Sequence, residues 1–221
     1  AQRPDPSARL QEALQGLIDD GTISGGMVPK MSGCARAVGG GVGSWLRHMV
    51  GRSYLQWLGP NVAIIRAMPN TPALVREGIT ALCAGSHAEE RDWKRASGIF
   101  ENLGKVVRVE EKHLDAVTGL SGCGPAYIYV ILESLTDAGI KVGLPRELAT
   151  VLASQTVLGA VKMLMQTGRH PASLKDDVTT PAGCTIDGLL ELEEGKLRVT
   201  LIKAVVQATR RAASLSGPTE K

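Results

Sequence analysis

The sequence predicts a chain of mixed class, α/β plus all-α, in which part of an α/β domain is followed by an all-helical region. Upstream of residue 112, three short apolar runs occur, and a segment with helical spacing separates the last two. Downstream of Leu114 the short runs stop, and helical spacing continues almost to the C-terminus. Strand-like and helical segments in alternation indicate an α/β domain, whereas a series of apolar helices indicates a helical bundle.

The three apolar runs are expected to form short strands of one sheet: Val62–Ile65, Ile79–Cys83 and Val106–Val109. A continuous apolar run is typical of a strand that is covered on both faces. Glu89 to Leu103 has apolar residues at helical spacing and is expected to end at Gly104. The loop Met68–Pro72 follows the first strand, at the edge where open α/β sheets bind ligands.

Four helices are expected after the sheet, over residues 126–138, 145–168, 183–193 and 197–215. Pro125 and Pro145 open the first two, while Gly168 and Gly195 end the second and third. In the second helix the apolar stripe is broad, formed by Leu148, Val151, Leu152, Leu158, Val161, Leu164 and Met165. In the last, Leu201, Ile202, Val205, Val206 and Thr209 are expected to face inward.

The helix after Pro125 has almost no polar face in its first three turns. Because monomers rarely expose so much apolar surface, part of the core is expected to lie between subunits. This predicts a homodimer, or a higher homo-oligomer, assembled through residues 120–215.

Composition argues against several other classes of function. A net charge of +3 without basic runs is too small to indicate nucleic-acid binding, and no apolar run comes close to the ~18 residues of a membrane span. The four cysteines and four histidines lack metal-ligand spacing, so neither a metal site nor a disulfide framework is expected. The N-terminus does not resemble a secretory signal, and a cytoplasmic location is expected. His170 before Pro171 is interpreted as a turn-shaping residue.

The turn-rich segment Asp177–Ile186 offers the clearest candidate site. It places two hydroxyls, Thr180 and Thr185, around a Pro-Ala-Gly-Cys turn at a helix start, where Pro181 suits the first turn. Unpaired backbone N–H groups at such a start, together with the helix dipole, bind anions such as carboxylates. A helix start that is merely capped is the plainer alternative for these ten residues.

Two further segments change that balance: Val117-Thr-Gly-Leu-Ser-Gly-Cys-Gly-Pro-Ala-Tyr127, which is read as a glycine-rich turn, and Arg66-Ala-Met-Pro-Asn-Thr-Pro72. Together with His170-Pro-Ala-Ser-Leu-Lys-Asp-Asp-Val-Thr-Thr-Pro181, in this order, they resemble the motifs of pyrroline-5-carboxylate reductases over about residues 58–216. The resemblance implies an incomplete Rossmann-type NAD(P)-binding domain, a helical C-terminal dimerisation domain, and NADPH or NADH as cofactor. It also implies an oxidoreductase of proline biosynthesis that transfers hydride to the C=N bond of 1-pyrroline-5-carboxylate and yields L-proline.

The resemblance also implies roles for particular residues. Thr185 would act in catalysis by hydrogen-bonding the ring nitrogen, while the substrate-binding segment would comprise Val178, Thr180, Pro181, Ala182, Gly183 and Cys184. The nicotinamide side of the cofactor would lie along Met68, Pro69, Asn70, Ser121 and Gly122. Each of these residues has a structural alternative, such as Asn70 as a turn former and Gly122 as a backbone hinge.

The chemistry of the segment favours imine reduction over alcohol oxidation. In hydroxyacid dehydrogenases, a Gly-x-x-Gly-x-Gly segment is followed by a lysine and an asparagine that serve catalysis, but here those positions hold Ile128 and Leu132. A pyrrolinium nitrogen can arrive already protonated, so hydride transfer to its ring requires no strong base. Threonine, serine and backbone amides suffice for that reaction.

Residues 1–57 are expected to be an atypical N-terminal segment, residues 58–112 the C-terminal part of the Rossmann-type domain, and residues 113–221 the helical substrate-binding and dimerisation domain. Residues ~10–51, including Ser24-Gly-Gly-Met-Val-Pro-Lys30, resemble a C-terminal segment of acetylglutamate kinase. Neither Gly39–Gly43 nor Gly122–Gly124 fits a dinucleotide fingerprint. We therefore expect weak NAD(P)H binding and impaired activity from these 221 residues alone. An inactive helical dimerisation module and a fusion remnant with a kinase segment are the alternatives.

Overall fold

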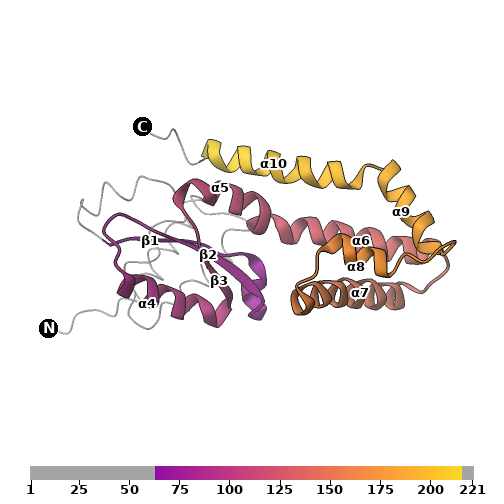
Figure 1. Ribbon diagram of the computed structural model, residues 1–221, viewed down its shortest axis with the longest axis horizontal. Helices are drawn as coiled ribbons and strands as arrows, with labels where there is room; N and C mark the ends of the chain where they lie inside the picture. The colour runs from indigo at the N-terminus through magenta and orange to yellow at the C-terminus, as the bar shows by residue number, and fades with distance from the viewer. Residues whose placement is uncertain (1–62, 216–221) are drawn as a thin grey trace. The chain divides into compact units, whose positions relative to one another are not determined.

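The computed structural model describes residues 63–215. The segment that resembles a kinase, the glycine run Gly39–Gly43 and the start of the first expected strand, Val62, lie outside the described residues. Contacts divide the chain into two compact units, Ala1–Pro125 with Val205–Lys221, and Ala126–Ala204. Figure 1 shows the elements of both units.

The first unit is built on a three-stranded sheet in the order β1-β2-β3. β1 (Ile65–Met68) pairs antiparallel with β2 (Gly78–Ala84), and β2 pairs parallel with β3 (Gly104–Arg108). The second and third strands match their predicted runs, whereas β1 begins at the last residue of its predicted run. Its position is set by the partner strand, because Ile65 lies opposite Ala84 and the Gly85 N–H donates to the Ile64 carbonyl at 2.8 Å.

Helices cover both faces of this sheet (Figure 1). α4 (Glu90–Phe100) packs Ala96 and Phe100 against Leu82, Ile65 and Ala67 on one face. On the other face, Leu114 of α5 (Leu114–Val117) packs against Ala81 and Cys83. Neighbouring residues of β2 therefore point to opposite buried faces, as the side-chain alternation of a strand requires. Coverage of both faces explains why β2 reads as a continuous apolar run, whereas β3 is half-buried to exposed.

Gly104 is required where α4 gives way to β3. A short 3₁₀ helix, Glu101–Leu103, ends at Gly104, whose φ of 136° is disfavoured for residues with a side chain. A Cβ there would also collide with the Gly78 carbonyl across the strand pair, 2.7 Å from its carbon. The helix end predicted at Gly104 is thus confirmed, and the last turn before it has 3₁₀ rather than α-helical geometry.

The remaining helices are α6 (Gly124–Lys141), α7 (Arg146–Thr167), α8 (Pro171–Asp177), α9 (Cys184–Glu194) and α10 (Leu197–Leu215). Four of these five match predicted helices, and α8 is an addition. Gly168 caps α7 with a φ of 64°, and Gly195 caps α9. The end of α7 was predictable because glycine readily takes the left-handed conformation that closes a helix. At the end of α9, Gly195 keeps a helical φ of −68°, and Lys196 takes the positive φ instead.

The second unit buries almost nothing large. Among its described residues, the side chains classed as buried are Ala149, Ala153 and Thr136. Gly139 of α6 lies against α7, where an added Cβ would come within 2.8 Å of the Ala149 Cβ. Small residues therefore contribute to the contact between these helices.

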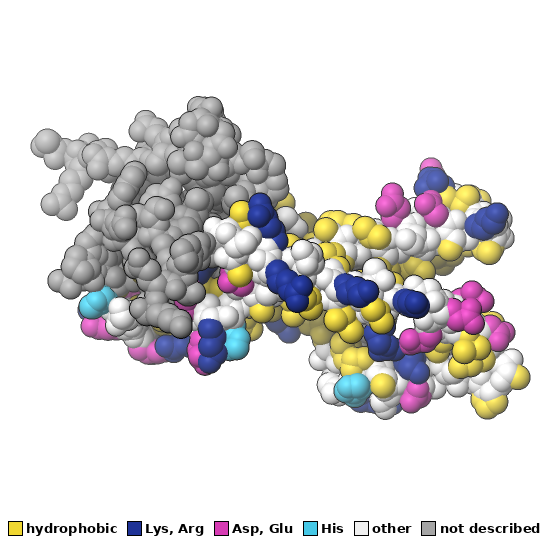
Figure 2. Space-filling model, turned by 90° about the horizontal axis from the view of Figure 1, so that it is seen from above, with side chains coloured by type: hydrophobic (Ala, Val, Ile, Leu, Met, Phe, Trp, Pro, Cys, Tyr) yellow, Lys and Arg dark blue, Asp and Glu magenta, His cyan; other side chains and the backbone are white. Residues whose placement is uncertain are grey.

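The predicted stripe of α7 lies on the surface of this unit. Leu148, Val151, Leu152, Leu158, Val161, Leu164 and Met165 are all exposed, with Val151 at 63%. Figure 2 shows apolar side chains spread between the charged ones on the helices of this unit. α7 is also long and apolar enough to cross a membrane by length and composition, with a mean hydropathy of 1.5 over its best window. The sequence reading missed this property because polar residues such as Ser154 and Gln155 interrupt the apolar run.

Candidate functional site

The predicted glycine-rich turn is helical rather than a turn. Thr118–Gly122 form a π-helical segment between α5 and α6, in which the Cys123 N–H donates to the Thr118 carbonyl at 2.9 Å. Two hydroxyls also donate to the preceding turn, Thr118 Oγ1 to the Leu114 carbonyl at 2.8 Å and Ser121 Oγ to the Val117 carbonyl at 3.0 Å. Short π segments are frequent at functional sites. Single-sequence patterns do not reveal them, because the side-chain spacing resembles that of an ordinary helix.

The structure brings the two predicted cofactor-side segments together. Met68 is the last residue of β1, and a Cβ on Gly122 would lie 2.7 Å from the Met68 Cε. The absence of a side chain at residue 122 therefore lets the π-helical segment pass close to the carboxyl end of β1. Pro69 and Asn70 follow Met68 and are buried, whereas Ser121 and Gly122 are half-buried.

Asn70 has a structural role in the described fold. Its Oδ1 accepts a hydrogen bond from the Ile79 N–H at 2.9 Å, and the residue is only 9% exposed. This bond holds the loop after β1 against β2. The structural alternative for Asn70, a turn former, is therefore supported.

The predicted substrate-binding segment lies in the second unit, between α8 and α9. Thr180 to Gly183 form a reverse turn in which the Gly183 N–H donates to the Thr180 carbonyl at 3.0 Å. Pro181 is its second residue, and Ala182 is its third with a φ of 55°. A proline followed by a positive φ is the pattern of a type II turn. The expectation that Pro181 sits in the first turn of the helix is wrong, because this turn comes before α9.

α9 begins one residue after the turn, with Gly183 as its N-cap residue. No side chain caps this end, and Asp187 contributes a negative charge to the first turn. The first backbone N–H groups of a helix have no partner within it, so this end attracts an anion or an acceptor group. Thr185 is half-buried within this first turn, whereas Thr180, Pro181, Ala182 and Cys184 are exposed.

Gly183 makes room for the Thr180 side chain. A Cβ at residue 183 would collide with the Thr180 Oγ1 and lie 3.1 Å from the Thr180 carbonyl oxygen. The Thr180 hydroxyl is therefore placed beside the amino end of α9. Val178, the C-cap residue of α8, is 62% exposed.

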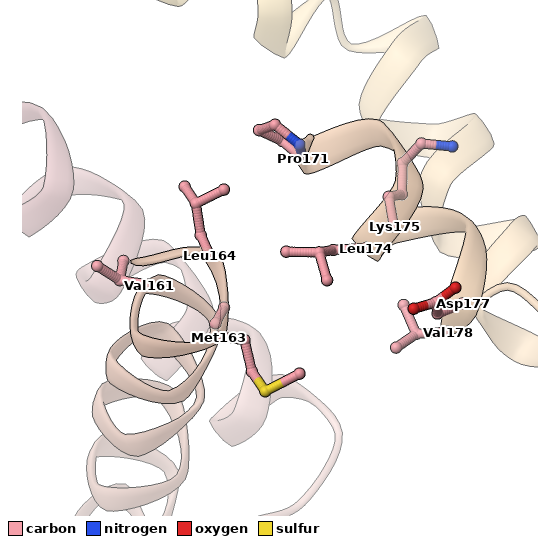
Figure 3. A pocket seen from close by; sticks show the side chains of 9 residues that line it. Val161, Met163, Leu164, Pro171, Leu174, Lys175, Asp177 and Val178 are labelled. Atoms are coloured by element: carbon pink, nitrogen blue, oxygen red, sulfur yellow. The ribbon is translucent and has the colours of Figure 1, made fainter. Parts of the chain in front are cut away.

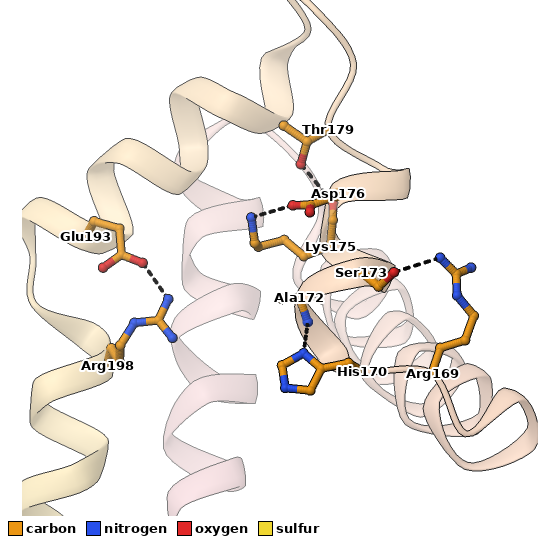
Figure 4. A network of polar contacts seen from close by, with 9 residues as sticks. All are labelled: Arg169, His170, Ala172, Ser173, Lys175, Asp176, Thr179, Glu193 and Arg198. Atoms are coloured by element: carbon orange, nitrogen blue, oxygen red, sulfur yellow. Dashed lines mark hydrogen bonds and ion pairs between the residues drawn. The ribbon is translucent and has the colours of Figure 1, made fainter.

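α8 leads into this turn and is braced by polar contacts (Figure 4). The Arg169 guanidinium binds both carboxylate oxygens of Asp177, at 2.5 and 3.0 Å, and donates to Ser173 Oγ at 3.1 Å. The guanidinium lowers the pKa of the Asp177 carboxyl below its ordinary value. His170 Nδ1 accepts from the Ala172 N–H at 3.2 Å, so its predicted turn-shaping role is confirmed as helix capping. The Thr179 hydroxyl donates to the Lys175 carbonyl at 2.8 Å.

An apolar groove of about 470 Å³ lies between α7 and α8 (Figure 3). Its lining is formed by Ala160, Val161, Met163, Leu164, Pro171, Leu174, Lys175, Asp177 and Val178. Apart from Lys175 and Asp177, these side chains are apolar. The groove is thus suited to apolar side chains rather than to a small anion.

The cysteines supply neither a metal site nor a disulfide within residues 63–215. Cys83, Cys123 and Cys184 are free thiols, and no group of three or more potential ligands occurs there. Burial raises the pKa of the Cys83 thiol to about 11, with a further contribution from the nearby Glu111 carboxylate. Glu111 is paired with Arg66 of β1. Cys83 is therefore protonated and unreactive at neutral pH.

The fold defines a class of protein in which part of an α/β domain is followed by a helical domain. The family model for the dimerisation domain of pyrroline-5-carboxylate reductase, "Pyrroline-5-carboxylate reductase dimerisation", matches residues 111–215. The pyrroline-5-carboxylate reductase of Glycine max is 52% identical over 161 residues, which cover 73% of this chain and 58% of that protein. The Schizosaccharomyces pombe enzyme is 43% identical, over 72% of this chain and 56% of its own length.

Solved structures agree with these relatives. The pyrroline-5-carboxylate reductase of Coxiella burnetii superposes with a TM-score of 0.71 at 41% identity, covering 74% of this chain and 61% of that one. The Plasmodium falciparum pyrroline carboxylate reductase, solved with NADP bound, has a TM-score of 0.70 at 37% identity, over 76% of this chain and 68% of that one. The chain belongs to the pyrroline-5-carboxylate reductase family, and it combines part of a Rossmann-type domain with a helical domain. It spans less than two thirds of the length of the curated relatives named above.

Proposed function

We propose that the protein acts in proline biosynthesis as an oxidoreductase that reduces 1-pyrroline-5-carboxylate to L-proline, with NADPH or NADH as the hydride donor. The observation that carries this proposal is the 52% identity to a pyrroline-5-carboxylate reductase over 161 residues. The NADP in the Plasmodium falciparum structure supports the cofactor class. The relatives include proteins of a cyanobacterium and an archaeon, Synechocystis and Methanosarcina acetivorans, which supports a cytoplasmic location.

The reverse turn before α9 is the proposed substrate site. The uncapped N–H groups that follow Gly183 suit a carboxylate, and the adjacent Thr180 hydroxyl supplies a second donor. Thr185, one residue into the helix, would accept a hydrogen bond from the protonated ring nitrogen and orient the C=N face. Val178, Pro181, Ala182 and Cys184 would shape this segment.

The carboxyl end of β1 and the π-helical segment form the proposed nicotinamide side. The contact between Met68 and Gly122 supports this assignment, because it joins the two segments that the motifs single out. Pro69, Asn70 and Ser121 complete the set. NAD(P)H supplies the hydride when bound, and these residues would present a fixed, largely water-excluding surface to its nicotinamide ring.

A homo-oligomer is the proposed assembly. Support comes from the dimerisation model, whose match includes every residue of the groove between α7 and α8 and the exposed stripe of α7. We propose that a second copy of the chain covers this apolar surface. Such burial also accounts for the hydropathy of α7 without a membrane.

The proposal is tested by steady-state kinetics of Thr185→Ala and Thr180→Ala. The assays use the chain alone and a version with the N-terminal unit of a relative joined ahead of Leu58. Thr185→Ala should mainly lower kcat, by ~1–3 kcal/mol in activation free energy, as for loss of one partner of a buried polar contact. Thr180→Ala should mainly raise KM for pyrroline-5-carboxylate. Parental kinetics in both variants would place the substrate elsewhere, and a joined protein without reductase activity would favour an inactive dimerisation module.

A further inference from the structure

Gly119 joins the π-helical segment to α10 within the first unit. The residue is buried, and a Cβ there would collide with the Thr209 Oγ1. It would also lie 2.9 Å from the Thr209 backbone nitrogen and 2.9 Å from the Val205 carbonyl oxygen. Two of these three atoms belong to the backbone of α10, which cannot move aside as a flexible side chain can. Only glycine at residue 119 therefore allows α10 to lie this close.

The same segment is held on another side by β1. Gly122 contacts Met68 at the carboxyl end of that strand. Here the neighbouring atom is the end of a flexible methionine side chain, so this contact adapts more easily than the one at Gly119. The π-helical segment thus has one adaptable neighbour and one rigid neighbour, and the rigid one is α10.

The hydrogen bonds of the segment show what this contact holds in place. The bond from the Cys123 N–H to the Thr118 carbonyl closes the wider π-helical turn, which is less favourable than an α-helical turn and persists where its surroundings impose it. Ser121 lies within this turn, and its hydroxyl is directed to the Val117 carbonyl. A change of register would move Ser121 and Gly122 relative to Met68.

We propose that Gly119 is a positioning residue: its contact with Val205 and Thr209 of α10 holds the π-helical register and so fixes Ser121 and Gly122 at the nicotinamide side. This role rests on the proposed function for its link to the cofactor. It makes Val205 and Thr209 of α10 part of the cofactor side, although both follow this segment by more than eighty residues.

Gly119→Ala is the direct test, and Gly124→Ala is the matched control, because a Cβ at residue 124 meets nothing within 4 Å. Amide hydrogen exchange at Cys123 reports the π-helical bond. NADPH titration followed by fluorescence reports the cofactor side, and it uses the version with the N-terminal unit of a relative joined ahead of Leu58. Gly119→Ala should accelerate exchange at Cys123 by about tenfold or more and weaken NADPH binding, whereas Gly124→Ala should change neither. Adding Thr209→Ala to Gly119→Ala removes the closest of the three contacts and should restore part of the protection.

Unchanged exchange in Gly119→Ala, or equal acceleration in both glycine variants, would overturn the proposal. Accelerated exchange with parental NADPH affinity would also overturn it, since the register would then not matter to the cofactor. If the joined protein binds no NADPH while exchange responds as expected, the proposed cofactor side is refuted, and the contact of α10 with the π-helical segment remains supported.

Discussion

Gly183 and Thr180 lie so close together that the Thr180 hydroxyl occupies the space of a side chain at residue 183. This contact concerns only sterics, because the φ of Gly183 is −82°, which any residue can adopt. The absence of a Cβ, rather than backbone freedom, is what the site requires of Gly183.

Gly183→Ala should therefore displace Thr180 and raise KM for pyrroline-5-carboxylate about tenfold, with a smaller effect on kcat. Gly188→Ala is the control in the same helix, because a Cβ there meets nothing within 4 Å. It should leave the kinetics unchanged and stabilise α9 by ~0.5–1 kcal/mol, the gain for alanine over glycine inside a helix. Equal KM values for both variants and the parent would count against the role given to Thr180.

Cys83 should be the least reactive of the three described thiols. At pH 8 an alkylating reagent, with peptide mapping by mass spectrometry, should label the exposed Cys184 quickly and Cys83 only after unfolding. The raised pKa also predicts a pH dependence of stability. The folded state holds the Cys83 proton more tightly than the unfolded chain, so this contribution is complete below pH 9 and is lost as pH rises towards about 11. Rapid labelling of Cys83 in the folded protein would contradict this account.

At the scale of elements, the junction between α4 and β3 depends on one residue. Gly104→Ala would place a Cβ at a φ of 136° and against the backbone of Gly78. We expect a loss of at least ~1–3 kcal/mol in the free energy of unfolding of the first unit, the range for strained backbone, measured by denaturant unfolding. Gly98→Ala, inside α4 where a Cβ meets nothing within 4 Å, should instead be stabilising. Equal stability of the two variants would show that β3 is not held at this register.

The elements also show what local sequence predicts well. α10 has the predicted bounds, and α7 ends at its predicted glycine, because apolar spacing and left-handed glycine caps are local signals. α8 was missed, since its seven residues are too few to show a periodic pattern. The π-helical segment was read as a turn, because its glycines are typical of turns as well as of close contacts.

For the whole molecule, the exposed apolar surface of the second unit predicts an obligate oligomer. Leu158, which is 46% exposed on α7, is a suitable position for a test. Leu158→Glu should cause aggregation or unfolding rather than a clean monomer, because the helices lack a core of their own. Lys162→Gln, on the same helix, is the control. It removes a charge instead of placing one in apolar surroundings, so it should leave assembly intact. A stable, well-folded monomer of the parent at micromolar concentration in light scattering would refute the prediction.

The sequence by itself determined the fold class, the four long helices, the sheet strands to within a few residues, and three motifs of one enzyme family. These features depend on neighbours along the chain: apolar periodicity, caps and the order of residues within a motif. The tertiary structure decided where β1 begins, that Pro181 lies in a reverse turn before α9, and why residues 119, 122 and 183 are glycines. Each of these depends on contacts between distant segments, as when Ala84 sets the start of β1, or when α10 leaves room for hydrogen alone at Gly119. Such contacts have no signature in a single sequence, because either partner alone is compatible with many other residues.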